Sequence, residues 1–309
     1  MKTIAILGAT SHIAKSIIIN FIKDNYNLVL FGRDKNRIEN FCLNNIKKYE
    51  ADIKSYDEFV NFEYDVVINC VGISIPEKQK KAAFELFKLS EDFDNLIMSY
   101  LNKNKNTLYI NISSGAVYNS DYSSPIESDS ISKYDVNINN PSEYYGICKF
   151  YSEKKHRSLS EYNIIDLRVF SYFSRFIDLN SGFFMSELMK SLLKTEIFKT
   201  NNNNIIRDYI HPLDLYNLVL LCIDAEKINK AFDVYSCSPV EKFEILDKFS
   251  SEFDLKYAIE NISYDVPTGN KNIYYSKNDK LKDIGYYPVY SSIEALISEA
   301  KGMIELYAN

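Results

Sequence analysis

The chain alternates short apolar runs with amphipathic stretches, and this alternation constrains its fold more than any other feature. The run at residues 65–70, Asp-Val-Val-Ile-Asn-Cys, has a continuously apolar centre, which is typical of a parallel strand buried on both faces. Such alternation predicts an α/β fold built on a doubly wound parallel sheet. We expect strands at residues 3–7, 27–31, 48–51, 65–70, 108–113 and 164–170, and helices at residues 11–23, 37–44, 78–102 and 145–161.

The composition excludes several classes of protein. The chain has 309 residues, of which 46% are hydrophobic, enough for a large buried core. A net charge of -6 and a pI near 5.3 argue against a nucleic-acid or membrane-surface binder. No apolar stretch of about 18 residues predicts a membrane span. The five cysteines show no metal-binding spacing, so we expect no metal site, free thiols and a cytoplasmic location.

The turn between the first strand and the first helix, Leu7-Gly-Ala-Thr-Ser-His-Ile-Ala14, predicts a phosphate-binding site. Dinucleotide-binding folds place a glycine-rich turn here, where backbone N–H groups and the helix N-terminus face a pyrophosphate. Only the first of the three usual glycines is present. Serine replaces the second glycine, a departure that affects how closely the backbone can approach the phosphates. The cofactor contacts expected in this turn are Gly8, Thr10, Ser11, His12 and Ile13.

Basic residues after the second predicted strand indicate which dinucleotide binds. An acid at this position grips the ribose 2′-hydroxyl of NAD, whereas an arginine suits the 2′-phosphate of NADP. The chain has Arg33 here, with Arg37 or Lys35 in support, and guanidinium groups match phosphate oxygens in a bidentate manner. The sequence therefore favours NADP(H) over NAD(H), against the alternative of a solvated charged loop.

Other cofactor contacts are expected where later strands of the sheet end. Asp52, placed just after the third predicted strand, is a candidate to bind the adenine amino group. Asn69, Val71 and Gly72 would border the cofactor at the end of the fourth strand. We therefore predict a dinucleotide-binding domain of Rossmann type at residues 1–172. A smaller substrate-binding α/β lobe is predicted at residues 173–309, with residues 205–224 returning to the first domain.

Tyr145 and Lys149 are candidates for acid/base chemistry. Four residues apart on a predicted helix, they lie on one face and can point into one pocket. A lysine cation favours the phenolate and lowers the pKa of a nearby tyrosine, which makes a general acid/base for a sugar or alcohol oxygen. The chain has 25 tyrosines, so this spacing also arises by chance, and a solvated helix face is the alternative.

Several ordered motifs resemble the extended short-chain dehydrogenase/reductase family, in its nucleotide-sugar epimerase/dehydratase/reductase branch. After the phosphate turn, the segment Ile112-Ser-Ser-Gly-Ala-Val-Tyr118 is similar to the family's Ser-Ser-x-x-Val-Tyr, and residues 145–149 match its Tyr-x-x-x-Lys. Residues 167–171 resemble the family's sixth-strand segment. Arg207-Asp-Tyr-Ile-His-Pro-Leu-Asp-Leu215 is close to another family motif, and residues 276–288 resemble the family's C-terminal Ser-Lys stretch.

The resemblance implies roles for individual residues. Ser114 would hydrogen-bond the substrate oxygen, Tyr145 would exchange its proton, and Lys149 would bind the nicotinamide ribose. Arg207 would contact the phosphates of a nucleotide-sugar substrate, with an ion pair to Asp208 as the alternative. Where the family often has another phosphate-binding arginine, the chain offers only Lys271. The resemblance also implies a homodimer.

The pair of residues that directly follows Ser114 limits the types of reaction that the resemblance implies. Sugar 4,6-dehydratases of this branch have an Asp-Glu pair here, whereas this chain has Gly115 and Ala116. Elimination is therefore not expected. We expect an NADPH-dependent reductase of a nucleotide-linked 4-keto-(deoxy)hexose, which would serve deoxysugar and surface-polysaccharide synthesis. The alternatives are a nucleotide-sugar 4-epimerase with tightly bound NAD and, more distantly, a dinucleotide-binding redox sensor without turnover.

Overall fold

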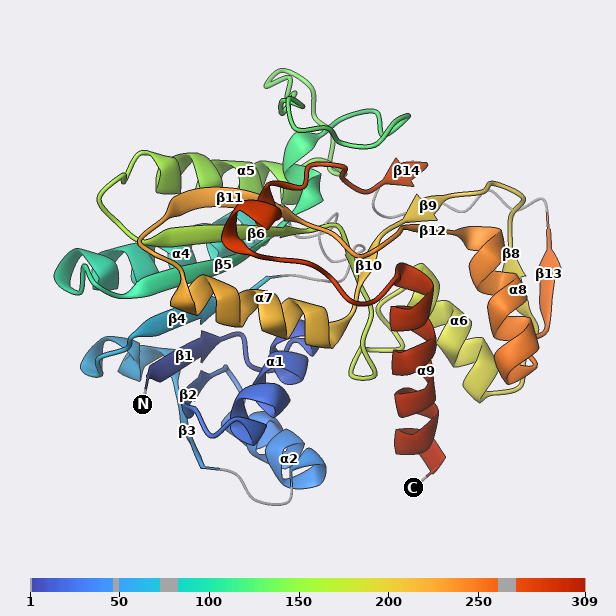
Figure 1. The fold of residues 1–309 in the computed structure, drawn as a ribbon, viewed down its shortest axis with the longest axis horizontal. Helices are drawn as coiled ribbons and strands as arrows, with labels where there is room; N and C mark the ends of the chain where they lie inside the picture. The colour runs from blue at the N-terminus through green and yellow to red at the C-terminus, as the bar shows by residue number, and fades with distance from the viewer. Residues whose placement is uncertain (1, 47–49, 73–82, 261–270, 309) are drawn as a thin grey trace.

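The computed structural model describes residues 2–46, 50–72, 83–260 and 271–308. At its centre is a parallel sheet of seven strands with helices on both faces, which confirms the predicted doubly wound α/β fold (Figure 1). The strand order is β11-β6-β5-β4-β1-β2-β3. The strands are β1 (Thr3–Leu7), β2 (Asn27–Phe31), β3 (Ala51–Lys54), β4 (Val66–Asn69), β5 (Leu108–Ser114), β6 (Ile164–Val169) and β11 (Asn229–Val234).

Both faces of the sheet are buried because the strands are apolar at successive positions. Side chains of a strand alternate between the two faces. Ile4 and Ile6 of β1 belong to one core cluster, whereas Ala5 and Leu7 belong to another on the opposite face. The first face is covered by α1 (His12–Lys23), α2 (Lys35–Asn45) and α7 (Pro212–Asp224), and the second by α4 (Ala83–Lys103) and α5 (Tyr144–Arg157) (Figure 1).

Some predicted boundaries differ from the structure. The third strand was expected at residues 48–51 but is β3 at Ala51–Lys54. The helix expected at residues 145–161 ends at Arg157. It ends early because the following backbone forms tight turns, in which Leu159 N–H donates to the His156 carbonyl and Tyr162 N–H donates to the Leu159 carbonyl. Residues 47–49 and 73–82, which include the start of another predicted helix, lie outside the described residues.

The sheet contains one strand that the sequence pattern did not predict. Strand β11 pairs in parallel with β6, from Asn229 opposite Ile164 to Val234 opposite Val169. Lys230 and Asp233 interrupt its apolar pattern, and an edge strand tolerates such residues because only one neighbour pairs with it. Asp233 is nevertheless buried, since it accepts hydrogen bonds from Tyr118 and Ser276.

A second hydrophobic cluster lies in the later part of the chain. It contains Leu188 of α6 (Phe184–Leu193), Leu246 of α8 (Lys242–Phe253) and Leu296 of α9 (Ser292–Ala308). None of the helices in the described ranges is long and apolar enough to cross a membrane. Short strands pair beside this cluster: β7 (Ser171–Tyr172) with β10 (Tyr209–Ile210), β8 (Phe198–Thr200) with β13 (Tyr257–Ile259), and β9 (Ile206–Arg207) with both β12 (Val240–Glu241) and β14 (Ile273–Tyr274).

Residues 205–224, the segment expected to return to the first domain, lie in two different parts of the structure. Residues 212–224 form α7, which packs against α1 and contributes Leu215 and Leu218 to the core of the large sheet. Residues 206–210 instead form β9 and β10 in the small sheets. This arrangement brings Arg207 and β14 toward the carboxyl ends of the parallel strands, where ligands bind in doubly wound folds.

Candidate active site

The turn after β1 has the backbone geometry of a phosphate-binding turn. Gly8 has a φ of +73°, and a Cβ built there would lie 2.7 Å from the carbonyl carbon and oxygen of Cys70. Only glycine fits, because a side chain would both strain the backbone and meet the end of β4. Ser11, at the position of the second usual glycine, caps α1, and its hydroxyl accepts a hydrogen bond from Ala14 N–H at 3.2 Å. The serine thus strengthens the start of the helix that would face the pyrophosphate.

A cavity of about 1110 Å³ opens beside this turn. It brings together most of the predicted cofactor residues, namely Gly8, Thr10, Ser11, His12, Arg33, Arg37, Val71 and Gly72. Burial and the neighbouring Lys15 lower the pKa of His12 to about 4, so its imidazole is neutral at pH 7. Its Nδ1 lies 3.3 Å from the Ser174 hydroxyl. The size and polar lining of the cavity suit an extended dinucleotide.

Asp52, Ile13 and Asn69 do not line this cavity, although Asn69 lies at the end of β4 as predicted and lines a smaller pocket with Val71 and Gly72. Asp52 lies within β3 rather than after it, opposite Val29 of β2, and is exposed; the placement just after the strand was wrong because β3 begins later than expected. Ile13 packs against the core. Asn69 supports the end of β4, since its amide donates to the Tyr109 hydroxyl at 3.1 Å and its Oδ1 accepts from Val71 N–H at 3.0 Å.

Two arginines that follow β2, Arg33 and Arg37, line the cavity. Asp34, the residue after Arg33, also lines the cavity and caps α2 by accepting a hydrogen bond from Arg37 N–H at 3.1 Å. Neither arginine forms an ion pair among the described residues, whereas Lys35 pairs with Glu58 at 3.0 Å and is not among the lining residues. Arg33 and Arg37 are therefore available to an anionic ligand.

Several residues that the sequence pattern did not identify line the same cavity. Lys15 is one helical turn after Ser11, a spacing that could have revealed it. Burial lowers the pKa of Lys15, and repulsion from Arg37 makes a smaller contribution in the same direction. Tyr56 and residues 176–181 also line the cavity, but nothing in their spacing identifies them.

Ser114, Tyr145 and Lys149 gather at the end of β5. Lys149 is buried, and its ammonium donates to the Ile112 carbonyl at 2.8 Å. The same ammonium lies 5.8 Å from the centre of the Tyr145 ring, so the two residues share a helix face as predicted. Ser114 is also buried, and its hydroxyl accepts a hydrogen bond from Ala116 N–H at 3.2 Å.

A residue from the far end of the chain completes this group. The hydroxyl of Tyr274, on β14, lies 3.2 Å from the Ser114 hydroxyl. Burial raises the pKa of Tyr274 well above 10, so its phenol is protonated at neutral pH. No sequence pattern identifies Tyr274, because it lies 160 residues from Ser114 in a segment of mixed composition.

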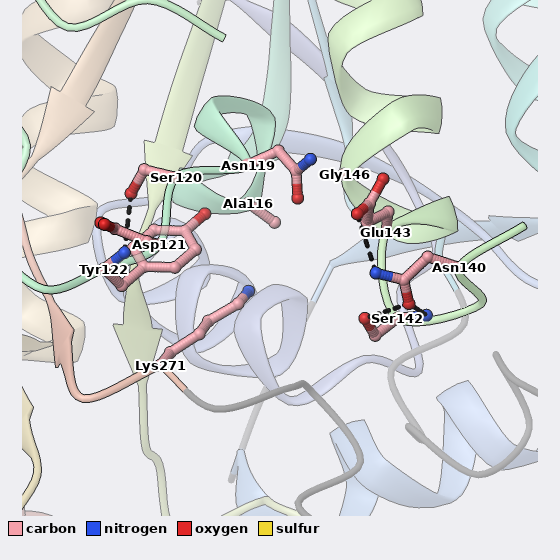
Figure 2. Close-up of a pocket in the computed structure, with 10 residues that line it drawn as sticks. All are labelled: Ala116, Asn119, Ser120, Asp121, Tyr122, Asn140, Ser142, Glu143, Gly146 and Lys271. Atoms are coloured by element: carbon pink, nitrogen blue, oxygen red, sulfur yellow. Dashed lines mark hydrogen bonds between the residues drawn. The ribbon is translucent and has the colours of Figure 1, made fainter. Parts of the chain in front are cut away.

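A smaller pocket of about 260 Å³ lies beside the candidate catalytic residues. It is lined by Ala116 and Gly146, which lie two residues after Ser114 and directly after Tyr145. Figure 2 shows the amino group of Lys271 pointing into the open centre of this pocket. Burial lowers the pKa of Lys271 to about 8, and repulsion from Arg207 makes a smaller contribution in the same direction.

Arg207 lies close to Lys271 and does not form the alternative ion pair with Asp208. The Asp208 carboxylate instead accepts hydrogen bonds from Ser236 N–H and the Ser292 hydroxyl. The Arg207 guanidinium donates to the Ile206 carbonyl at 2.8 Å and lies 5.7 Å from the centre of the Tyr274 ring. The ammonium of Lys271 lies 4.5 Å from the same ring. Arg207 and Lys271 therefore both lie beside Tyr274. The site has two cations even though no arginine is present near residue 271.

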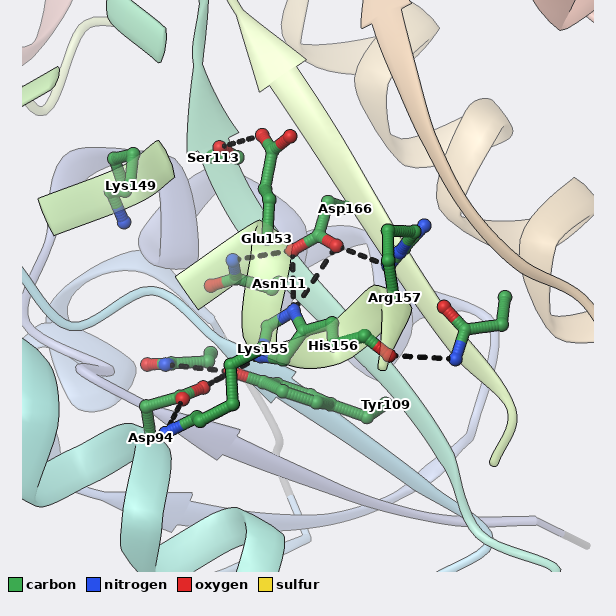
Figure 3. A network of polar contacts seen from close by, with 12 residues as sticks. Asp94, Tyr109, Asn111, Ser113, Lys149, Glu153, Lys155, His156, Arg157 and Asp166 are labelled. Atoms are coloured by element: carbon green, nitrogen blue, oxygen red, sulfur yellow. Dashed lines mark hydrogen bonds and ion pairs between the residues drawn. The ribbon is translucent and has the colours of Figure 1, made fainter. Parts of the chain in front are cut away.

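The helix that carries Tyr145 and Lys149 is fixed by a buried polar network (Figure 3). His156 lies between two carboxylates, with Nε2 2.7 Å from Asp94 and Nδ1 2.9 Å from Asp166. Arg157 and Asn111 also donate to Asp166, at 2.5 and 2.7 Å, and Lys155 pairs with Asp94. The contacts of His156 are those of a structural residue.

Solved structures of known proteins share the fold of this chain. No curated protein matches the sequence. The fold is similar to UDP-glucose-4-epimerase from Stenotrophomonas maltophila, solved with bound NAD and formylated UDP-arabinopyranose (TM-score 0.83, 13% identity, covering 100% of this chain and 99% of that chain). It is also similar to UDP-glucuronic acid 4-epimerase from Bacillus cereus with UDP-glucuronic acid and NAD (TM-score 0.79, 15% identity, 99% of each chain).

A third similar structure is dTDP-glucose 4,6-dehydratase from Bacillus anthracis in complex with NAD (TM-score 0.77, 12% identity, covering 99% of this chain and 97% of that chain). At these identities the similarity shows the fold. The sequence itself matches a family model over residues 4–237, most of its length. The chain belongs to the NAD dependent epimerase/dehydratase family, and it is an enzyme of the short-chain dehydrogenase/reductase type.

Proposed function

We propose that the protein is an NADPH-dependent reductase of the 4-keto group of a nucleotide-linked hexose, with the 4-keto-6-deoxyhexoses as the first candidates. The observation that carries the proposal is the pair Arg33 and Arg37 at the end of β2. Both line the large cavity without an ion-pair partner among the described residues, and Asp34, the acid next to Arg33 in the sequence, caps α2 through its Oδ1. Guanidinium groups placed in this way suit a 2′-phosphate.

The residues of the cavity fit a dinucleotide. The space that a Cβ of Gly8 would fill is occupied by the backbone of Cys70 and Val71, so the turn stays close to the end of β4, and the N-terminus of α1 follows directly. The N–H groups of this turn and helix would hold the pyrophosphate. Lys149 would hold the nicotinamide ribose at the inner end. Bound there, the cofactor supplies the hydride for the carbonyl carbon.

The chain's own residues manage the proton and the charge of this reaction. As the carbonyl oxygen gains negative charge, Tyr145 donates its phenolic proton to that oxygen. The Lys149 ammonium, 5.8 Å from the Tyr145 ring, stabilises the phenolate that remains. Ser114 donates a hydrogen bond to the same oxygen. Arg207 and Lys271 would hold the substrate's diphosphate beside the small pocket.

The structure gives no room for the acid that elimination needs. A Cβ at Gly115 would lie 2.4 Å from ring atoms of Phe170, so no carboxylate side chain fits at that position. Ala116 is buried and carries no ionisable group. These two residues support hydride transfer without dehydration.

The second candidate is a nucleotide-sugar 4-epimerase with tightly bound NAD. It is favoured by the similarity in fold to 4-epimerases solved with NAD, and it needs the same Ser114, Tyr145 and Lys149. An epimerase retains its cofactor, whereas a reductase exchanges it in each turnover. Both candidates would act in the cytoplasm on sugar nucleotides, and we expect a homodimer.

The test compares cofactor use directly. The purified protein is supplied with NADPH or NADH and with UDP- and dTDP-linked 4-keto-6-deoxyglucose, and oxidation of the cofactor is followed at 340 nm. We expect turnover with NADPH. Replacing the guanidinium in Arg33→Ala should weaken NADPH binding at least tenfold and leave NADH within about twofold, since only the 2′-phosphate contact is lost.

The control variant for this titration is Lys35→Ala, because that lysine neighbours Arg33 but pairs with Glu58. It should leave the affinity for both cofactors near the wild-type value. Equal losses for NADPH and NADH in Arg33→Ala would refute the 2′-phosphate contact. Tightly bound NAD in the purified protein, together with conversion of a UDP-hexose without added reductant, would establish the epimerase instead.

A further inference from the structure

The Ser114 hydroxyl has two hydrogen-bonding partners within the protein. A serine hydroxyl can donate one hydrogen bond and accept two. Ala116 N–H already donates to Ser114 Oγ at 3.2 Å, and the Tyr274 hydroxyl lies at the same distance from this oxygen. Two of the three positions around the hydroxyl are therefore occupied by protein atoms, and the third is open to a ligand.

The direction of the Ser114–Tyr274 hydrogen bond decides what Ser114 can offer a substrate. If Ser114 donated to Tyr274, its only proton would be used, and it could not donate to a carbonyl oxygen. If Tyr274 donates, both acceptor positions of Ser114 are filled, and its proton must point toward the ligand. Ser114 would then be fixed as a donor, which is what an oxygen with developing negative charge requires.

The surroundings of Tyr274 favour donation by its hydroxyl. The phenol is buried and protonated, and Ser114 is its one hydrogen-bond partner among the described residues. The ring is enclosed by Tyr122 and Phe170, both with ring centres 5.1 Å away, and by the Lys271 ammonium at 4.5 Å. The nearby Tyr122 hydroxyl donates elsewhere, to the Gly115 carbonyl at 3.2 Å. A buried phenol with one partner donates to that partner, because an unsatisfied donor would cost free energy.

We propose that Tyr274 is a positioning residue that acts through Ser114: its hydroxyl donates to Ser114 Oγ and thereby directs the Ser114 proton to the reacting oxygen of the substrate. The proposal rests on the proposed function only in that Ser114 meets that oxygen. It holds equally for reduction and for 4-epimerisation, since both pass through a carbonyl and an alcohol at the same position. Tyr274 itself transfers no proton to the substrate.

Strand β14 gives this arrangement a connection to substrate binding. Tyr274 lies opposite Arg207 in the parallel pairing of β14 with β9. The group that orients the catalytic hydroxyl is therefore on the strand next to the arginine proposed to hold the diphosphate. A nucleotide bound at Arg207 would hold Tyr274 in place at the moment when the sugar reaches Ser114.

A double-mutant cycle tests the proposal. Tyr274→Phe, Ser114→Ala and the double variant are assayed with NADPH and the UDP- and dTDP-linked 4-keto-6-deoxyglucose substrates. Tyr274→Phe should lower kcat about tenfold and change KM by less than about threefold, because the lost hydrogen bond acts mainly in the transition state. In the Ser114→Ala background the same change should have no further effect on kcat. Tyr275→Phe, which removes the hydroxyl of the next residue, is the matched control and should keep the wild-type rate.

Two outcomes of the cycle would overturn the proposal. If Tyr274→Phe lowered kcat by the same factor with and without Ser114, Tyr274 would act independently of that serine. An unchanged kcat in Tyr274→Phe would show that the hydrogen bond is not used.

If the wild-type protein reduced none of these keto-sugars, the reductase would be refuted, and neutron diffraction from crystals exchanged into D₂O would test the hydrogen bond without a substrate. A deuterium on the Tyr274 oxygen directed at Ser114 would support the proposal. A Ser114 deuterium directed at Tyr274 would refute it.

Discussion

Replacing His156 should remove a large, pH-dependent part of the stability. His156 is fully buried between Asp94 and Asp166, at 2.7 and 2.9 Å. Burial opposes its charge, but the two carboxylates outweigh burial and raise the pKa of His156 from 6.5 to about 9. At about 1.4 kcal/mol for each pKa unit, the charged imidazolium stabilises the fold by roughly 3 kcal/mol.

The sign follows from the raised pKa. The folded protein holds the His156 proton more tightly than the unfolded chain does, so this stabilisation is fully present below pH 6.5. It is lost as the pH rises through about 9. The two carboxylates agree with this assignment: burial opposes their charge, yet His156 lowers the pKa of both Asp94 and Asp166. All three groups are therefore charged together near neutral pH.

The assay is urea unfolding of the wild type and of His156→Asn at pH 6.5, 8 and 9.5. The free energy of unfolding of the wild type should exceed that of the variant at pH 6.5, and the difference should shrink by about 3 kcal/mol by pH 9.5. Lys271, with its pKa lowered to about 8, titrates in the same range but does so in both proteins and cancels. A difference that stays constant over this range would refute the charged imidazolium.

Three further substitutions test other parts of the structure. Gly8→Ala should lower the free energy of unfolding by more than about 2 kcal/mol and abolish NADPH binding, as measured by urea unfolding and fluorescence titration, since φ is +73° and the contacted atoms are backbone. Tyr145→Phe should lower kcat at least 100-fold with little change in KM, and full activity would refute its role as the acid. Arg168→Met should destabilise the protein by about 3–5 kcal/mol in urea unfolding, because Glu153 and Asp233 would stay buried without their cation, and a loss below about 1 kcal/mol would contradict this.

The sequence predicted those parts of the fold and site that depend on local pattern. Strands β1 and β2 have the predicted bounds because each is a short apolar run beside a turn. Gly8 and the spacing of Tyr145 and Lys149 were recognisable because a turn and a helix face are set by neighbours in the chain. Strand β11 was missed because its pairing with β6 depends on residues about 65 positions away rather than on its own polar composition.

The residues that the sequence could not place act through distant contacts. Lys271 was recognised only as a lone cation, and its position beside Arg207 depends on the pairing of β14 with β9. Tyr274 lies 160 residues from Ser114, so only the folded chain brings the two hydroxyls together. The partner that such a side chain contacts depends on how distant segments of the chain pack together, which the local sequence pattern does not show.

The contribution of Tyr274 changes how the later part of the chain relates to catalysis. Ser114, Tyr145 and Lys149 all come from β5 and α5, so the large sheet and its helices alone bring them together. The hydroxyl that faces Ser114 comes from β14, which pairs only with β9 among the described strands. If Tyr274 directs the Ser114 proton, the large sheet and its helices by themselves would bring Ser114, Tyr145 and Lys149 together but would orient the Ser114 proton poorly. The paired strands β14 and β9 would then hold both the group that orients the Ser114 proton and the arginine proposed to bind the diphosphate, so substrate binding and orientation of the serine would depend on the same small sheet.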